Sequence, residues 1–241
     1  MRWQLVVSTV SAIGALAVVP VAVISPISHR VQINQQKASC EATLKSMALV
    51  MRIYSNNERG ERYPSLTPRL DALAPDPDVE RLFDSTTPYT GSDMPRDIVH
   101  SCFEMHDYYY LGYAVASDED VEVFAKAFRQ AHDAGLPLNT DIRDPNETDS
   151  EHRFQLYGLR EGIQRAFYDD FNIGGCNPGG DALIQSKLPV LIEHVGMHDA
   201  NKAHVLFLDG HVEYRQYPGE WPMTEKTIGL LGELEALTPR S

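Results

Sequence analysis

A group of histidines and carboxylates near the C-terminal end of the chain could bind a metal ion or carry out acid–base chemistry. Its members are His194, His198, His204, His211, Glu193, Asp199, Asp209 and Glu213. Imidazole and carboxylate groups are common zinc ligands and common general acids and bases. His194 and His198 are four residues apart, so a helix would place both on one face.

The sequence around these residues favours a sheet over a helix and weakens the catalytic interpretation. Leu188 to Glu193 is an apolar run typical of a buried strand, and Gly196 would interrupt a helix. The chain has neither an HExxH motif nor a Gly-x-Ser-x-Gly elbow. We therefore predict no catalytic, cofactor-binding or metal-binding residue. A structural calcium ion held by loop carboxylates stays open as an alternative.

Asp209-Gly210 lies between two alternating apolar runs and predicts a β-hairpin over residues 204–217. A two-residue turn would pair Leu208 with His211, and Val205 with Tyr214. One face of the hairpin would then carry Val205, Phe207, Val212 and Tyr214. The other face would carry His204, His211, Glu213 and Arg215, beside Leu206 and Leu208.

Composition limits the classes of partner. The chain has 241 residues, of which 43% are hydrophobic, and a formal net charge of −13. This content is sufficient for one or two small domains with a core. Nucleic acid is excluded as a partner, because an acidic chain without a basic run cannot neutralise phosphates.

The three cysteines are Cys40, Cys102 and Cys176, and none forms a CxxC motif. A domain outside the cytoplasm would be expected to form one disulfide and keep one thiol. Cys102 and Cys176 lie in polar or glycine-rich segments and are the candidate pair.

The N-terminal residues 1–28 predict a membrane anchor. Leu5 to Ile24 is an apolar run of about the ~20 residues that cross a bilayer as a helix. Arg2 on the N-terminal side favours a cytoplasmic N-terminus. The chain is thus expected to be a single-pass protein of the inner (cytoplasmic) membrane with its C-terminal domain outside the cytoplasm. A cleaved secretory signal is the alternative.

Residues 29–60 predict an amphipathic continuation of this helix. Its apolar stripe is formed by Cys40, Leu44, Met47, Met51 and Tyr54. Residues 61–241 predict an extracytoplasmic α+β domain with a strand over Tyr108 to Ala116, a capped helix beginning after Ser117 and a C-terminal helix over Thr224 to Leu237. We expect the long helix to pack on a C-terminal antiparallel sheet, with inserted loops and short helices.

Two segments resemble a known family. The stalk segment SCEATLKSMALVMRIYSNNERGERYPSL is similar to type IV pilin-like proteins and type II secretion pseudopilins. The segment GMHDANKAHVLFLDGHVEYRQYPGEWP resembles the prepilin-type processing-associated domain, with its histidine, spacer and Asp-Gly. The family motif falls on His198, Asp209, Gly210, His211 and Val212.

The resemblance implies a pilin-like fold and a non-enzymatic role in pilus-like assembly or type II secretion. It implies partners in the membrane, through the N-terminal helix, and among other pilin-like subunits. The alternative from a different class is an exported, membrane-tethered hydrolase or metal-binding module that uses the residues 193–213.

Overall fold

The fold was examined in a computed structural model, which describes residues 31, 33–57, 62–66, 73–75, 108–143, 156–168, 171 and 178–237. The chain divides into two units, Met1–Cys40 and Glu41–Ser241. Residue 31 and residues 33–40 of the first unit are helical. All packing discussed below belongs to the second unit.

No helix within the described ranges has the combination of length and apolar content that a bilayer crossing requires. The predicted anchor, residues 1–28, lies outside these ranges. Cys102 and Cys176, the predicted disulfide pair, also lie outside them.

Residues 41–57 of the second unit form a helix with one buried stripe. Leu44, Met47 and Met51 are buried, as the spacing predicts, and Val50 extends the stripe. Leu49 points the other way and is 56% exposed. The apolar period of this segment therefore corresponds to a face that packs in the core of the domain.

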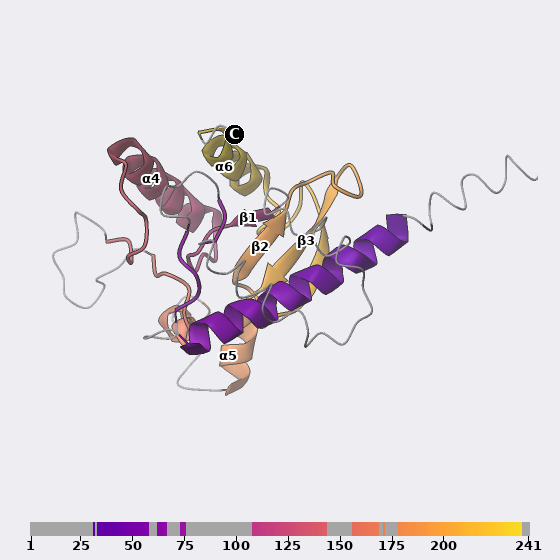
Figure 1. Ribbon diagram of the computed structural model, residues 1–241, viewed down its shortest axis with the longest axis horizontal. Helices are drawn as coiled ribbons and strands as arrows, with labels where there is room; N and C mark the ends of the chain where they lie inside the picture. Colours follow the sequence, from indigo (N-terminus) through magenta and orange to yellow (C-terminus); the bar gives the residue numbers. More distant parts are fainter. Residues whose placement is uncertain are drawn as a thin grey trace, which may run out of the picture. The chain divides into compact units, whose positions relative to one another are not determined.

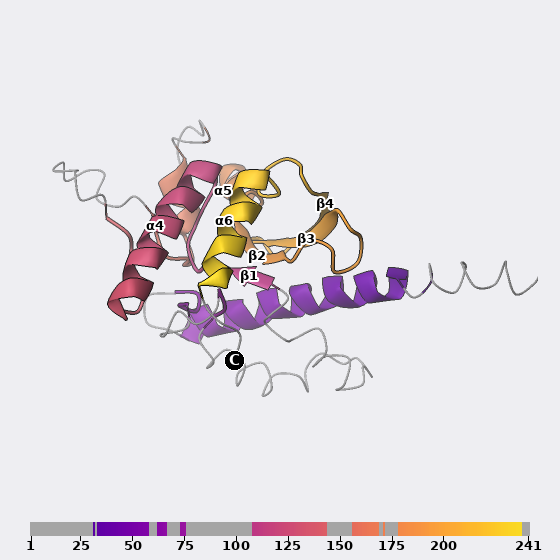
Figure 2. The ribbon, with the colours of Figure 1, turned by 90° about the horizontal axis from the view of Figure 1, so that it is seen from above.

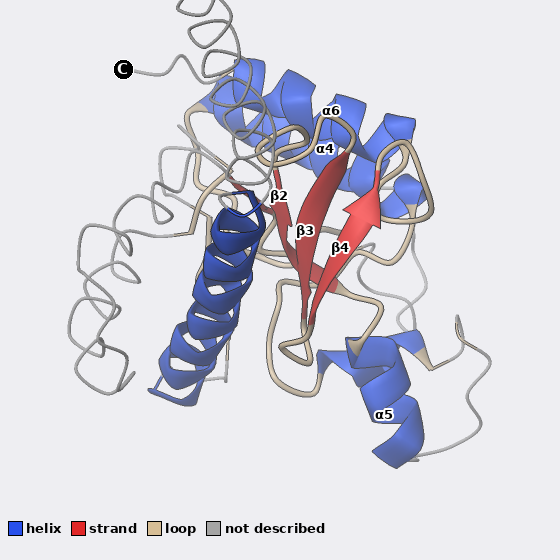
Figure 3. Cartoon of the chain, turned by 90° about the vertical axis from the view of Figure 1, so that its right-hand side faces the viewer, coloured by secondary structure: helices blue, strands red, loops and turns tan. Residues whose placement is uncertain are grey.

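The sheet has four antiparallel strands in the order β1-β2-β3-β4. The strands are β1 (Tyr108–Tyr110), β2 (Pro189–Glu193), β3 (Lys202–Phe207) and β4 (Val212–Gln216). Figure 3 shows β2, β3 and β4 side by side. The protein is thus an α+β fold with an antiparallel sheet, as the sequence predicts.

The predicted register of the last hairpin is wrong by one residue. Val205 pairs with Glu213 and Leu206 pairs with Val212, not with the residues one position further on. The Phe207 N–H donates to the His211 carbonyl over 3.0 Å, and the Gly210 N–H donates to the Phe207 carbonyl over 2.9 Å. The loop therefore has three residues, with Gly210 at φ 90° in the position that favours glycine.

A shift of one residue moves every β4 side chain to the opposite face of the sheet. The helix-side face, toward residues 41–57, carries Glu193, His204, Leu206, Val212 and Tyr214. The opposite, α6-side face carries Val205, Phe207, His211, Glu213 and Arg215. The predicted all-apolar face of Val205, Phe207, Val212 and Tyr214 is therefore divided between the two sides.

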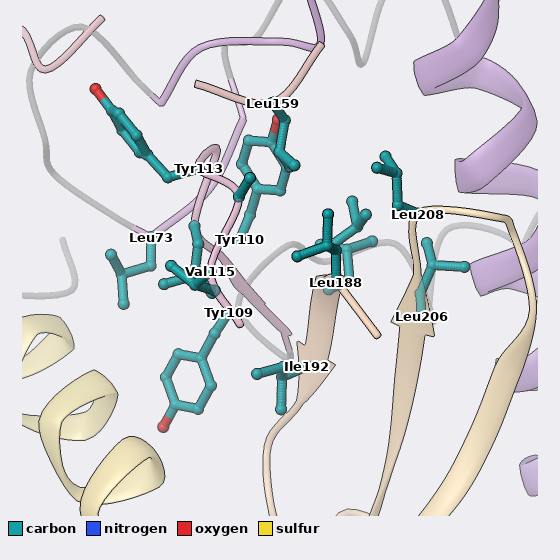
Figure 4. Packing of buried hydrophobic residues seen from close by; sticks show 14 of the residues in the cluster. Leu73, Tyr109, Tyr110, Tyr113, Val115, Leu159, Leu188, Ile192, Leu206 and Leu208 are labelled. Atoms are coloured by element: carbon teal, nitrogen blue, oxygen red, sulfur yellow. The ribbon is translucent and has the colours of Figure 1, made fainter. Parts of the chain in front are cut away.

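Contacts on both sides support this division. On the helix side, the space beside Gly210 is bounded by the Ala48 methyl group, and Arg52 Nη2 donates to the Leu208 carbonyl over 3.5 Å. On the other side, the Tyr109 hydroxyl lies next to Gly232. Figure 2 shows the strands between the indigo helix and the helices above it. In Figure 4, Leu206 and Leu208 lie toward the indigo helix, and Tyr109 lies toward the yellow one.

Helices α4 (Asp118–Ala134) and α6 (Glu225–Ala236) cover the α6-side face (Figure 1). Ser117 and Asp120 form the predicted capping box, and Gly135 is the left-handed C-cap. Thr224 caps α6, and its hydroxyl and that of Thr227 both donate to Asp118. This shared carboxylate joins the N-terminal ends of the two helices.

Other expectations hold only in part. The strand predicted over Tyr108 to Ala116 ends at Tyr110, because the chain turns at Gly112 with φ 69° and continues as an isolated bridge from Tyr113 to Gly158. Among the expected short helices is α5 (Pro178–Gln185). A 3-10 helix, η3 (Ile163–Phe167), contacts α5.

The helix–sheet contact predicts that replacing two leucines of this helix, five residues apart, changes the free energy of unfolding by different amounts. Leu44→Ala should lower the free energy of unfolding by about 3 kcal/mol, because it leaves a cavity in the core. Leu49→Ala should change it by less than about 0.5 kcal/mol, because that side chain is exposed. Urea titration followed by circular dichroism measures both, and equal losses would contradict the packing.

Candidate functional site

The most buried carboxylate among the described residues is that of Glu193, which lies between two histidines. Glu193 ends β2 with 2% of its surface exposed. His204 of β3 makes two contacts with the Oε2 atom of Glu193. Its Nδ1 atom lies at 2.8 Å, and its backbone N–H donates over 2.9 Å. His198, in the loop that joins β2 to β3, places its Nε2 atom 3.1 Å from the other oxygen, Oε1.

This arrangement gives one carboxylate three donors. A carboxylate accepts hydrogen bonds, and imidazole N–H groups at His204 Nδ1 and His198 Nε2 are the donors that match these two contacts. Both imidazoles are also buried, with 4% and 8% of their side chains exposed. A buried carboxylate is costly without such partners, and each bond here is partly charge-assisted. Glu193 thus ties the β2–β3 loop and β3 to the end of β2.

Further polar groups lie near the two rings. The His204 ring lies 4.5 Å from the Tyr214 ring, and the Tyr214 hydroxyl donates to Asp199 Oδ2 over 2.8 Å. Burial raises the pKa of Tyr214, and the bond to Asp199 raises it further. Lys45 and, more weakly, His204 lower the pKa of Glu41 on the adjoining helix. The histidine pair therefore faces groups from the helix, β4 and the loop.

A separate polar group lies on the α6-side face. His211 Nδ1 is 2.5 Å from Asp209 Oδ1, and its Nε2 is 3.1 Å from Glu213 Oε1. Arg215 Nε donates to Glu213 Oε2 over 2.6 Å. These bonds, that of Arg215 first, lower the pKa of Glu213. The Phe207 ring is covered by the parallel His211 ring at 4.5 Å and by the Arg215 guanidinium at 4.9 Å.

The residues that the sequence groups as one cluster thus form two, on opposite faces of the sheet. His194 belongs to neither, because its ring lies 4.1 Å from Tyr109 and 3.7 Å from Glu235 of α6. His194 and His198 do not share a site despite their four-residue spacing, because the segment is not helical. Asp199 and Asp209, two further carboxylates of the predicted group, accept hydrogen bonds from the Tyr214 hydroxyl and the His211 backbone N–H.

The family-motif residues divide in the same way. His198 lies beside Glu193. Asp209 and Gly210 lie in the turn, where Asp209 Oδ1 accepts a hydrogen bond from the His211 N–H. Val212 begins β4 on the helix-side face. The sequence reading missed the central position of Glu193. The alternation of β2 and β3 could have paired Glu193 with His204, but the path of the loop that returns His198 has no local signal.

Comparisons with known proteins give no relative. No family model matches the chain, and neither a curated protein nor a solved structure matches it.

Because the Glu193 carboxylate is buried, a substitution that keeps its size should lower the stability of the fold strongly. Glu193→Gln should lower the free energy of unfolding by about 3 kcal/mol, because it removes a buried charge and places an amide N–H₂ beside ring N–H groups. Urea titration at neutral pH measures the loss.

Glu213→Gln is the matched control, because Glu213 also bonds a histidine but has a side chain that is 43% exposed. Its loss should be below about 1 kcal/mol. The pKa of Glu213 is lower in the folded protein, so this contribution is present at neutral pH and disappears as the pH falls through the folded value. Equal losses for the two variants at neutral pH would contradict the special position of Glu193.

Proposed function

We propose that the protein is a membrane-anchored, pseudopilin-like assembly protein without enzymatic activity, linked to type II secretion or pilus-like assembly. The N-terminal apolar run would hold it in the inner membrane, and the domain from residue 41 would lie outside the cytoplasm. Its partners would be other pilin-like subunits.

One observation carries this proposal: an amphipathic helix that follows an apolar N-terminal run packs on the face of an antiparallel sheet. Residues 41–57 bury Leu44, Met47 and Met51 in the core that the sheet helps to form. A helix and a sheet each need a partner for their apolar faces, and here each supplies one to the other. The resemblance of the stalk and of the Asp-Gly hairpin to pilin-like proteins supports the same role.

The exposed side of the helix adds a second support. Leu49 is 56% exposed. In the proposed assembly a second subunit would cover this side chain, since the cores of protein interfaces are more apolar than the rest of the surface.

The alternative, a tethered hydrolase or metal-binding module, requires the residues 193–213 to act together. Glu193, His198 and His204 lie on one face of the sheet, and Asp209, His211 and Glu213 lie on the other. Each histidine in these sets bonds a carboxylate of its own group. The two faces thus favour the structural interpretation over a combined site.

Anchoring can be tested with charges in the apolar run. Replacing Ala15 and Ala17 by Arg should move the full chain out of the membrane fraction, because each arginine costs about 2.5–3.5 kcal/mol at the centre of a spanning helix. The matched variant with Leu at both positions should stay in alkali-washed membranes. Recovery of the unmodified chain in the soluble fraction would refute the anchor.

Assembly can be tested with a photoreactive amino acid at position 49 of the full chain in membranes. Irradiation should produce cross-linked species with a second protein subunit. The same amino acid at position 183, an exposed leucine of α5, should not. Cross-links of equal yield at both positions, or at neither, would contradict a specific contact through the helix.

A further inference from the structure

The exposed side of α6 carries a glycine that the packing of the described residues does not require. Gly229 lies in the interior of this helix, where glycine is among the least favourable residues. Its backbone does not adopt the left-handed conformation that favours glycine. A methyl group at position 229 would meet no atom from the rest of the described chain within 4 Å. Glycine at such a position leaves a notch in which another molecule can approach the helix closely.

Two carboxylates flank this notch. Glu225 lies one turn before Gly229 and Glu233 lies one turn after it, and all three residues are exposed. Among the described residues, no cation pairs with the Glu225 carboxylate. Glu233 bonds Arg129 over 2.6 Å but keeps 67% of its side-chain surface exposed. The α6 notch, formed by Glu225, Gly229 and Glu233, therefore has a small centre and two negative ends.

The exposed side of the helix over residues 41–57 has the opposite character. Leu49, at its centre, is 56% exposed. Lys45, one turn earlier on the same side, also has 56% of its side-chain surface exposed. The Lys45 ammonium donates to Glu41 over 2.6 Å and has two further N–H groups for another carboxylate. This side of the helix thus presents a large apolar side chain next to a positive charge.

The two surfaces match in spacing as well as in charge. Residues four apart lie one turn apart on the same side of a helix. With Leu49 placed over Gly229, Lys45 comes beside Glu225 if the two helices run parallel. If they run antiparallel, Lys45 comes beside Glu233. A carboxylate therefore faces the ammonium in either direction.

One chain does not make this contact with itself. The helix over residues 41–57 and α6 lie on opposite faces of the sheet (Figure 2). The two surfaces can meet only between two copies of the chain. Because they are different surfaces, each copy can offer its helix to one neighbour and its α6 notch to another.

We propose that Leu49 of one copy docks in the α6 notch of a second copy, with Lys45 paired to a carboxylate that flanks the notch. Leu49 is then removed from water, which favours the contact. Repetition of the same contact gives an open row of subunits. This inference rests on the proposed assembly function and names the surface that the exposed side of the helix contacts.

The test uses the full chain in membranes with a small diazirine-bearing aliphatic amino acid at position 49. Irradiation should give a product of twice the mass of the chain, and mass spectrometry of its peptides should join position 49 to α6 of the second copy. Attachment to a different protein, or to another segment of the second copy, would overturn this inference and leave the assembly function standing. Irradiation without any protein cross-link would overturn both.

A variant that fills the notch tests its role. Gly229→Leu should lower the yield of the α6 cross-link at least about tenfold, which corresponds to ~1.4 kcal/mol of binding. It should not lower the melting temperature in circular dichroism, because leucine forms helices better than glycine and has space at this position. Ala134→Leu, at an exposed position of α4, is the matched control and should leave the yield unchanged. An unchanged yield in Gly229→Leu would contradict docking in the notch.

Charge exchange tests the ion pair. Lys45→Glu should lower the yield of the α6 cross-link about threefold, the size expected for an exposed pair. Adding Glu225→Lys should restore the yield if the helices run parallel, and adding Glu233→Lys should restore it if they run antiparallel. Such a rescue can arise only between copies, since the two helices lie on opposite faces of the sheet. Rescue by neither double variant would contradict the pairing of Lys45 with the notch.

Discussion

The three-residue loop at Leu208, Asp209 and Gly210 decides what each face of the sheet carries. Side chains alternate between the two faces along a strand. The length of this loop therefore decides which β4 side chains lie on which face of the sheet. With Phe207 paired to His211, the helix-side face receives Val212 and Tyr214. That face then meets residues 41–57, which bury their apolar stripe in the same core. The packing of the helix on the sheet depends on this one register.

The register also separates the polar groups that lie close in the sequence. It places Tyr214 over His204, beside the buried Glu193, and sends His211 and Glu213 to the side of Phe207 and α6. Each group then satisfies its own charges. Glu193 has the two imidazoles, and Glu213 has Arg215 and His211. The two clusters lie on opposite faces of the sheet, so they do not form one combined site.

Local features of the sequence were predicted well, and long-range features were not. The capping box at Ser117 and the stripe from Leu44 to Met51 depend on residues within a turn or two of each other. The hairpin was also foreseen, but not its register, because Asp-Gly fits both a two-residue and a three-residue loop. The contact of His198 with Glu193 depends on the path of an eight-residue loop, residues 194–201, which has no periodic signal.

The most direct test of the register is a two-dimensional NMR measurement of contacts between α-protons across β3 and β4. In an antiparallel pair these protons are close only at positions that do not exchange backbone hydrogen bonds. The structure predicts cross-peaks between Leu206 and Val212 and between His204 and Tyr214. Cross-peaks between Phe207 and Val212 and between Val205 and Tyr214 would show the two-residue turn instead and contradict the division of the two faces.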